Sequence, residues 1–224
     1  MKSKILSLVI LTFVIFLTGC EYDNYEPPKS FLTGNVVYNG KNVGVRTGAT
    51  QLELWQYGYQ LRSKIAVDIS QDGTYSARLF DGNYKLVRLA GAPWVNQTDS
   101  IDVVVSGNTV VDVPVTPYFT ITGQSFTLNA GVITSTCTVV KVGTLAIENL
   151  TLYVSTTSIV DANNKVQEHV LAASALTDLS TPKTNTITLN ASFAGMKAVY
   201  VRLGVKAAGV NERFYTPVQK IAVP

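Results

Sequence analysis

Histidine and cysteine are scarce in this sequence, which limits the chemistry that the chain can carry. One histidine, His169, and two cysteines, Cys20 and Cys137, are present among 224 residues. A zinc site needs three or four His, Cys or acidic ligands at close spacing. A serine-histidine relay needs a positioned nucleophile, and no Gly-x-Ser-x-Gly elbow occurs. We therefore predict no catalytic residue, no metal and no cofactor, and we interpret His169 as an exposed residue of a polar connection.

Acidic residues leave two further alternatives open. A glycosidase needs two carboxylates at a set separation in space, and the chain has 15 acidic residues. Most of them lie in turns or at isolated outward positions, so we do not expect an enzyme. The segment Asp161 to Lys165 is rich in oxygen ligands but lacks the glycine and the distal glutamate of an EF-hand loop. We predict an Asx turn there.

Excess charge of either sign is absent from the main part of the chain. Lys2 and Lys4 account for two of the 18 basic residues, so 16 others face 15 acidic residues. A near-neutral chain without a basic stripe does not suit nucleic acid. It suits a protein that binds carbohydrate or another protein.

Long hydrophobic runs are also missing, apart from one short run at the N-terminus. Ile5 to Leu17 is too short for the roughly 20 residues that span a bilayer. It follows two lysines and ends in Leu17-Thr18-Gly19-Cys20, which resembles the lipobox of bacterial lipoproteins. This resemblance implies a signal peptide at 1–19, acylation of Cys20 and membrane attachment through lipid alone. The alternative is an ordinary secretory signal with a chance cysteine.

The segment after Cys20 is polar and contains two consecutive prolines. Residues 20–30 include three acids and Pro27-Pro28, so we expect an extended tether. Its acidic start resembles the surface-export signal of Bacteroidetes lipoproteins. That resemblance implies an outer-membrane protein exposed at the cell surface.

The rest of the chain lacks any long stretch of helical periodicity. Short runs rich in Val, Ile, Thr and Tyr recur between Gly, Asn and Asp turns, which favours an all-β fold. The length suits two β-sandwich domains, which we place at 31–115 and 116–224. The segment from Val113 to Tyr118 contains two prolines and is interpreted as the linker. At Val170 to Leu179 we expect at most a turn or two of helix.

Turn signals in the first domain predict two hairpins. Asp81-Gly82 separates the expected strands 75–80 and 84–89, and Ser106-Gly107-Asn108 separates 100–105 and 109–113. Asp-Gly and similar pairs are typical of tight antiparallel turns.

These residues resemble the carboxypeptidase-regulatory, transthyretin-like sandwich. The matching motifs are Gly34 to Tyr38, Leu52-x-Leu54-x-Gln56, Asp72-Gly73-x-Tyr75 and Phe80-x-Gly82-x-Tyr84. With Gly91-Ala92-Pro93-Trp94 and Val113 to Tyr118, the chain is similar to the Bacteroidetes lipoproteins of domain-of-unknown-function family 3823. The resemblance implies a C-terminal immunoglobulin-like sandwich and an association with SusC/SusD-like nutrient uptake systems.

The second domain has five strand candidates and one remaining thiol. The candidates are residues 119–122, 132–142, 147–155, 184–189 and 197–205. Cys137 shares strand parity with Ile133 and Val139, so we expect it to be buried. With Cys20 used by lipid, no disulfide can form within the chain. On the strand Val199 to Lys206, the valines alternate with Tyr200, Arg202 and Lys206, which we predict to form an outward partner face.

The positions of the aromatic residues suggest two sites for sugar. Sugar rings present flat C–H faces edged with hydroxyls, so they favour exposed indole or phenol rings beside polar groups. The candidate glycan-binding residues are Glu53, Trp55, Tyr57 and Tyr59 on one strand face, and Trp94, Asn96, Gln97 and Asp99 in a loop. Packing is the alternative for both, because the Trp55 face could contact the second domain and Trp94 could close the end of the sandwich. We predict a non-catalytic surface lipoprotein that binds glycans; the alternative is a module that docks a neighbouring outer-membrane protein.

Overall fold

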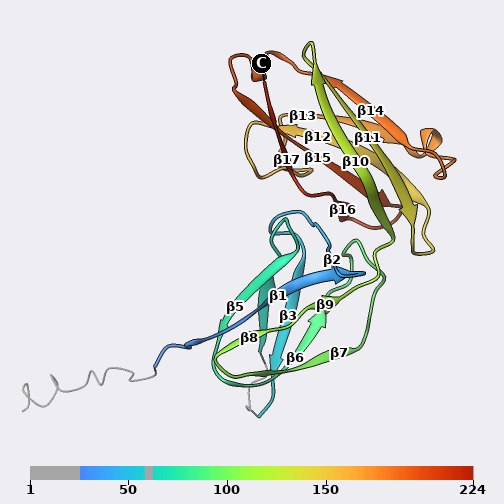
Figure 1. Ribbon diagram of the computed structural model, residues 1–224. Coiled ribbons are helices and arrows are strands. Elements are labelled where there is room, and N and C mark those ends of the chain that lie inside the picture. Colours follow the sequence, from blue (N-terminus) through green and yellow to red (C-terminus); the bar gives the residue numbers. More distant parts are fainter. Residues whose placement is uncertain (1–25, 59–62, 224) are drawn as a thin grey trace, which may run out of the picture.

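A computed structural model describes residues 26–58 and 63–223 of the chain. These residues form two domains, each built from two β-sheets, and the chain passes from one domain to the other near residue 117 (Figure 1). The prediction of an all-β chain with two sandwich domains is confirmed. The expected signal peptide, the expected lipidation site Cys20 and the candidate residue Tyr59 lie outside the described residues.

The first domain packs a five-stranded sheet against a four-stranded one. The five-stranded sheet is organised around β1, which pairs antiparallel with β2 and β5 and parallel with β8 and β9. Its strands are β1 Ser30–Tyr38, β2 Lys41–Asn42, β5 Thr74–Leu79, β8 Asn108–Val110 and β9 Val113–Pro114. The other sheet has the order β4-β3-β6-β7. Its strands are β3 Gln51–Gln56, β4 Lys64–Asp68, β6 Gly82–Arg88 and β7 Ser100–Val105.

Both predicted hairpins of this domain are wrong, because each turn joins strands of different sheets. β5 pairs with β1, whereas β6 pairs with β3 and β7. Likewise β7 pairs with β6, and β8 pairs with β1. The carboxylate of Asp81 links the two turns. Its Oδ1 accepts hydrogen bonds from Ser30 Oγ at 2.5 Å and from the Gly107 amide at 3.0 Å.

The second domain packs a three-stranded sheet against a larger one. The smaller sheet has the order β10-β11-β14, and the larger has the order β13-β12-β15-β16, with β17 also paired to β15. Their strands are β10 Phe119–Asn129, β11 Val132–Lys141, β14 Lys183–Thr188, β12 Ile147–Ser155, β13 Gln167–Ala172, β15 Ala198–Ala207, β16 Arg213–Tyr215 and β17 Gln219–Ala222. All five predicted strands are present.

The structure also decides three smaller predictions in the second domain. Cys137 is buried in the core between the sheets, as its parity indicated. The helical prediction near residue 170 is met by one 3₁₀ turn, Ala173–Ala175. His169 lies on strand β13 and not in a connection, and its Nδ1 lies 2.5 Å from Asn185 Oδ1 on β14. Polar side chains thus bridge the two sheets at this edge.

Contacts between the domains come from loops at the end of the first domain and, in the second, from β15, β16, the loop between them and the loop after β12. Gly44 forms a β-bridge with Tyr215, and the Tyr215 amide donates to the Gly44 carbonyl at 3.0 Å. Arg46 forms an ion pair with Glu212 at 2.6 Å. The Tyr118 amide donates to the Pro93 carbonyl at 3.1 Å. Part of the expected linker is strand β9, so the chain crosses between the domains over residues 115–118.

Candidate functional site

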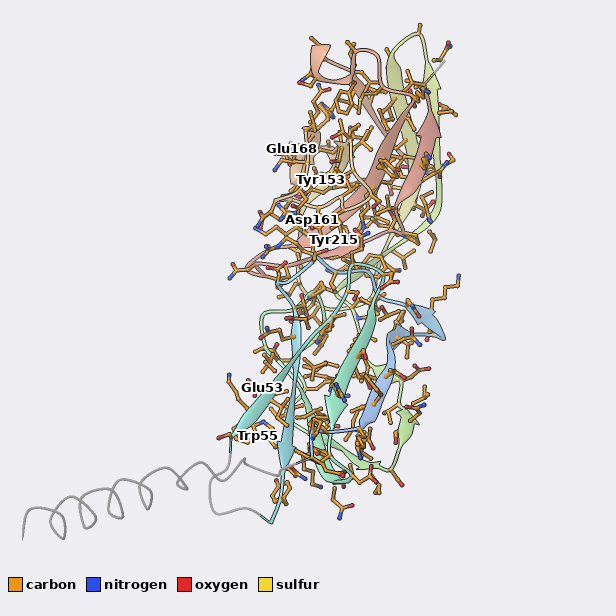
Figure 2. All side chains as sticks on the ribbon, turned by 90° about the vertical axis from the view of Figure 1, so that its left-hand side faces the viewer. Glu53, Trp55, Tyr153, Asp161, Glu168 and Tyr215 are labelled. Carbon is orange, nitrogen blue, oxygen red and sulfur yellow. The ribbon has the colours of Figure 1, made fainter. Side chains whose placement is uncertain are left out.

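The outer face of sheet β4-β3-β6-β7 carries the indole of Trp55. Antiparallel register places Trp55 between Lys64 of β4 and Lys85 of β6. Trp55 is half-buried and contributes to none of the hydrophobic cores. Figure 2 shows it at the end of β3 that lies away from the second domain. The alternative that Trp55 packs against the second domain is therefore excluded.

Charged side chains surround the indole and pair with one another. Glu53 lies two residues before Trp55 on the same face, and its Oε1 accepts from Lys64 Nζ at 2.6 Å. The Glu53 side chain is 10% exposed and that of Lys64 is 60% exposed, so the lysine covers the carboxylate. Lys85 forms an ion pair with Asp102 on β7. The indole therefore lies among donors and acceptors whose charges balance locally.

Two further polar or aromatic residues extend this face along β3. Gln51 is the first residue of β3, at the end of the strand nearer the second domain. Its Nε2 donates to Asp68 Oδ1 at 2.7 Å. Tyr57 follows the last residue of β3 and is 52% exposed. We name the set Gln51, Glu53, Trp55, Tyr57, Lys64 and Lys85 the β3 face. A row of this kind can stack a sugar ring on an aromatic surface and bond its hydroxyls at the edges.

The second predicted sugar site, around Trp94, does not form. Trp94 is 1% exposed and lies in the core of the first domain, so it cannot stack against a ligand. The segment is held by a bridge between Trp94 and Pro117 and by the Val95 amide, which donates to the Thr116 carbonyl at 2.8 Å. The packing alternative is therefore correct for Trp94, because this segment closes the end of the sandwich.

The polar residues after Trp94 do not converge on a ligand position. Asp99 accepts from Arg88 Nη2 at 2.6 Å, and Arg88 also donates to the Pro114 carbonyl at 3.0 Å. Asn96 is exposed and Gln97 is half-buried. Asp99 therefore forms an ion pair with the buried Arg88 of the first domain.

The predicted partner face on β15 is also wrong. Arg202 is 0% exposed. Tyr200 packs against a small cluster of Tyr153, Val160 and Tyr215, and Lys206 pairs with Glu148 at 2.7 Å. The parity of the strand is as predicted, but the chain covers this side with the loop after β12 and with the first domain.

Arg202 joins the two domains through backbone carbonyls. It donates to the carbonyls of Val45 and Gln71 in the first domain, and to those of Val160 and Thr216 in the second. Its guanidinium lies 4.5 Å from the centre of the Tyr215 ring, a favourable cation–π contact. Burial lowers the pKa of Arg202 to about 10, so the group remains charged at neutral pH.

The loop that covers Arg202 is shaped by a buried carboxylate. Asp161 Oδ1 accepts from the amides of Asn163 and Asn164 at 2.8 and 2.9 Å, so the predicted Asx turn is present. The Ala162 amide donates to Tyr215 Oη at 3.2 Å. Burial raises the pKa of Tyr215. Figure 2 shows Asp161 and Tyr215 on the side of the second domain that faces the first.

Within residues 26–58 and 63–223, no group of three or more His, Cys, Asp or Glu side chains is placed to hold a metal ion. In the same part of the chain, no helix has the length and apolar character needed to cross a bilayer.

Comparisons with known proteins place the chain in a family. Residues 30–116 match the model described as protein of unknown function (DUF3823) N-terminal domain, and residues 119–220 match the model of its C-terminal domain, DUF3823_C. A comparison with curated proteins gives no match.

Solved structures of the same family superpose on the chain. A DUF3823 protein from Bacteroides ovatus is 39% identical with a TM-score of 0.83, and one from Parabacteroides merdae is 30% identical with a TM-score of 0.80; each match covers 88% of this chain and 100% of the other. A third structure, described as that of a proposed carbohydrate binding protein from Bacteroides uniformis, shares the fold at 22% identity and a TM-score of 0.71, with the same coverage. On the two domain matches and the two closer structures, this chain belongs to the DUF3823 family.

Proposed function

We propose that the protein is a non-catalytic glycan-binding lipoprotein, anchored through Cys20 and displayed on the outer surface of the outer membrane. In this proposal it serves a SusC/SusD-like nutrient uptake system as an accessory protein. The observation that carries the binding function is the half-buried Trp55 on an open sheet face, flanked by balanced charges. The structure from Bacteroides uniformis described as that of a proposed carbohydrate binding protein, which shares the fold at 22% identity, supports the same ligand class.

Calorimetric titration against plant, host and microbial polysaccharides tests the binding function. The protein to use runs from Glu21 to Pro224 and includes every described residue. We expect saturable heat with one polysaccharide class. Trp55→Ala should lower the affinity at least about fivefold, because one stacked ring contributes on the order of 1–3 kcal/mol.

A matched control separates the indole from general surface aromaticity. Phe31 is an exposed aromatic residue on β1, in the opposite sheet of the same domain. Phe31→Ala should leave the affinity unchanged. If both substitutions weaken binding equally, or neither does, the site is not on the β3 face.

The anchor, the partner and the lack of catalysis have separate tests. Metabolic labelling with a fatty acid should mark the wild-type protein and not Cys20→Ala, and external protease should cleave it on intact cells. Crosslinking on those cells should capture a SusC/SusD-like neighbour. Incubation with the bound polysaccharide should release no shorter products.

If no polysaccharide of the panel gives binding heat, the alternative function, a module that docks a neighbouring outer-membrane protein, is favoured instead. Its surface would not be the one predicted from sequence, since Arg202 is buried and Tyr200 and Lys206 are engaged within the domain. The crosslinked neighbour would then be the primary ligand.

A further inference from the structure

Two phenylalanines and a valine lie together on the outer face of the five-stranded sheet. Phe31 on β1 lies opposite Arg78 on β5 and, on its other side, opposite Asn108 on β8. Phe80 comes two residues after Arg78, and Val110 comes two residues after Asn108. Alternate residues of a strand face the same side, so Phe80 and Val110 are diagonal neighbours of Phe31 on this face.

These three side chains are open to solvent. Phe31 is 41% exposed, Phe80 is 45% exposed and Val110 is 73% exposed. Every other phenylalanine of residues 26–58 and 63–223 is buried or half-buried. Single exposed hydrophobic residues need no explanation, whereas a contiguous group rimmed by polar residues marks an interaction site. We name Phe31, Arg78, Phe80 and Val110 the β1 patch.

Arg78 adds a positive charge to this apolar surface. Its guanidinium carbon lies 5.9 Å from the centre of the Phe31 ring, which is within the range of a cation–π contact. Within the part of the chain that the structure describes, Arg78 takes part in no ion pair. The β1 patch therefore combines two aromatic rings with a cation that can still pair with an anion.

The size of the β1 patch argues against a stable protein partner. A standard protein interface buries about 800 Å² on each side and uses roughly 20–30 residues. The β1 patch consists of four residues on three strands. A surface this small is effective only when another link holds it beside its target, because the link supplies a high effective concentration.

The position of the β1 patch in the chain indicates what that target is. Phe31 is the second residue of β1, which starts in the part of the first domain away from the second domain (Figure 1). In the sequence, the proposed lipid attachment site Cys20 precedes Ser30 by ten residues. A lipid on Cys20 would therefore hold the β1 patch near a bilayer. Aromatic rings favour the membrane interface, and an arginine beside them can reach the lipid phosphates.

We propose that the β1 patch docks on the lipid bilayer in which Cys20 is anchored. Phe31, Phe80 and Val110 enter the interface, and the Arg78 guanidinium pairs with lipid phosphate. This inference rests on the proposed anchor at Cys20. The β3 face belongs to the opposite sheet, so docking leaves it open to a glycan.

The test holds the protein on vesicles without using Cys20. Residues 21–224, preceded by a hexahistidine segment, are bound to a nickel-chelating lipid in vesicles of phosphatidylcholine, with or without phosphatidylglycerol. Phe80→Trp in a Trp55→Phe background puts one indole into the β1 patch. Trp94, which is 1% exposed in the core, is the internal reference. Lipids with brominated acyl chains then quench an indole that enters the interface.

We expect the introduced indole to be quenched and its emission to shift to shorter wavelength, while Trp94 is unaffected. Phe31→Ser and Val110→Ser, each added to the reporter protein, should lower the ratio of docked to undocked molecules about fivefold, because each removes apolar contact area. Arg78→Gln should lower it about fivefold on vesicles with phosphatidylglycerol only.

Val104→Ser is the matched control for Val110→Ser. Val104 is 67% exposed on β7, at the same end of the first domain but in the opposite sheet. This variant should be quenched as strongly as the reporter protein. Because all the substituted side chains are exposed, each variant should keep the melting temperature of the reporter protein to within a few degrees.

Three results would overturn the proposal in whole or in part. Absence of quenching on every vesicle overturns docking and leaves a protein as the occupant of the β1 patch. Equal quenching in all variants shows that the link alone brings the indole to the lipid. An equal effect of Arg78→Gln on both kinds of vesicle overturns the pairing with anionic lipid. Failure of the proposed anchor appears separately, in the fatty-acid labelling of Cys20, since the vesicles do not use that residue.

Discussion

Asp81 is the residue that fixes the path of the chain between the two sheets of the first domain. Its carboxylate binds the Ser30 hydroxyl and the Gly107 amide, which belong to two other segments of the domain. These bonds hold the pKa of Asp81 below its usual value, the Ser30 hydroxyl being the larger cause and the Gly107 amide the smaller. A short side chain thus closes the corner where an Asp-Gly pair alone would suggest a hairpin.

Asp81→Asn should lower the melting temperature at neutral pH. Because the folded-state pKa is depressed, the carboxylate stabilises the fold above its unfolded pKa of about 3.9. That stabilisation is lost as the pH falls through the folded pKa, so the difference between wild type and variant should shrink in acid. Asp178→Asn is the control, since Asp178 bonds only to Ser180 and Thr181 of its own turn. A gap between wild type and Asp81→Asn that widens toward pH 3 would contradict this assignment.

Cys137 should react with thiol reagents only when the second domain opens. It is buried, and burial raises its pKa to about 11, so little reactive thiolate is present at neutral pH. In residues 21–224 it is the sole cysteine by sequence. Labelling should be slow without denaturant and rapid above the unfolding midpoint, and a reductant should leave the melting temperature unchanged. Rapid labelling of the folded protein would indicate a reactive thiol.

At the scale of the element, alternation in the sequence predicts the inner face of a strand better than its outer face. The core-facing residues lie where their parity indicates: Leu52 and Leu54 on β3, and Val199, Val201, Leu203 and Val205 on β15. What covers the outer face comes from distant parts of the chain. Arg202 bonds the carbonyls of residues 45, 71, 160 and 216, which are far apart in the sequence. The pattern of residues around position 202 therefore cannot predict these contacts.

Contacts with distant parts of the chain also explain why the two predicted hairpins are wrong and why the predicted Trp94 site does not form. Asp-Gly supplies a tight turn, but whether the next strand returns to the same sheet depends on which strand offers a free edge. β1 offers its edge to β5 and β8, so both turns become corners between sheets. Trp94 is buried in the core of the first domain, and its segment forms a bridge with Pro117 at the domain crossing. Trp55 remains a candidate, since its strand ends away from that crossing.

Gly44 sets how closely the two domains approach, and Gly44→Ala should loosen their contact. A Cβ at this position would lie 2.5 Å from the Tyr215 carbonyl oxygen and 2.8 Å from Arg202 Nη2. Gly34→Ala is a control for steric damage within the first domain, because its Cβ would lie 1.8 Å from the Val111 carbonyl oxygen. We expect Gly34→Ala to lower the stability of the first domain and Gly44→Ala chiefly to weaken the coupling between domains. Equal effects of both on first-domain stability would contradict this division.

At the scale of the whole molecule, the buried Arg202 should make the two domains unfold as one unit. Each domain carries its own probe, because Trp55 and Trp94 are in the first and Cys137 is in the second. In the wild type, tryptophan fluorescence and thiol labelling should report the same denaturation midpoint. Arg202→Met leaves carbonyls of both domains without their donor. It should cost several kcal/mol, because each buried acceptor left without a partner costs roughly 1–3 kcal/mol, and it should separate the two midpoints.

Lys206→Met is the matched control for that substitution. Lys206 lies on the same strand, but its ion pair with Glu148 stays within the second domain. Its removal should shift both midpoints by less than about 1 kcal/mol and keep them coincident. Separate midpoints already in the wild type would show that Arg202 does not couple the domains.

The position of Ser30 gives the molecule a direction relative to a membrane. Ser30 begins β1 beside Asp81, and Gln56 at the end of β3 lies against the neighbouring Gly82. β1 therefore begins at the end of the first domain where β3 ends, away from the second domain (Figure 1). Ten residues reach at most about 35 Å, so a lipid on Cys20 would keep Trp55 close to the bilayer and raise the second domain above it. A sugar chain lying along β3 would then point with one end toward the membrane.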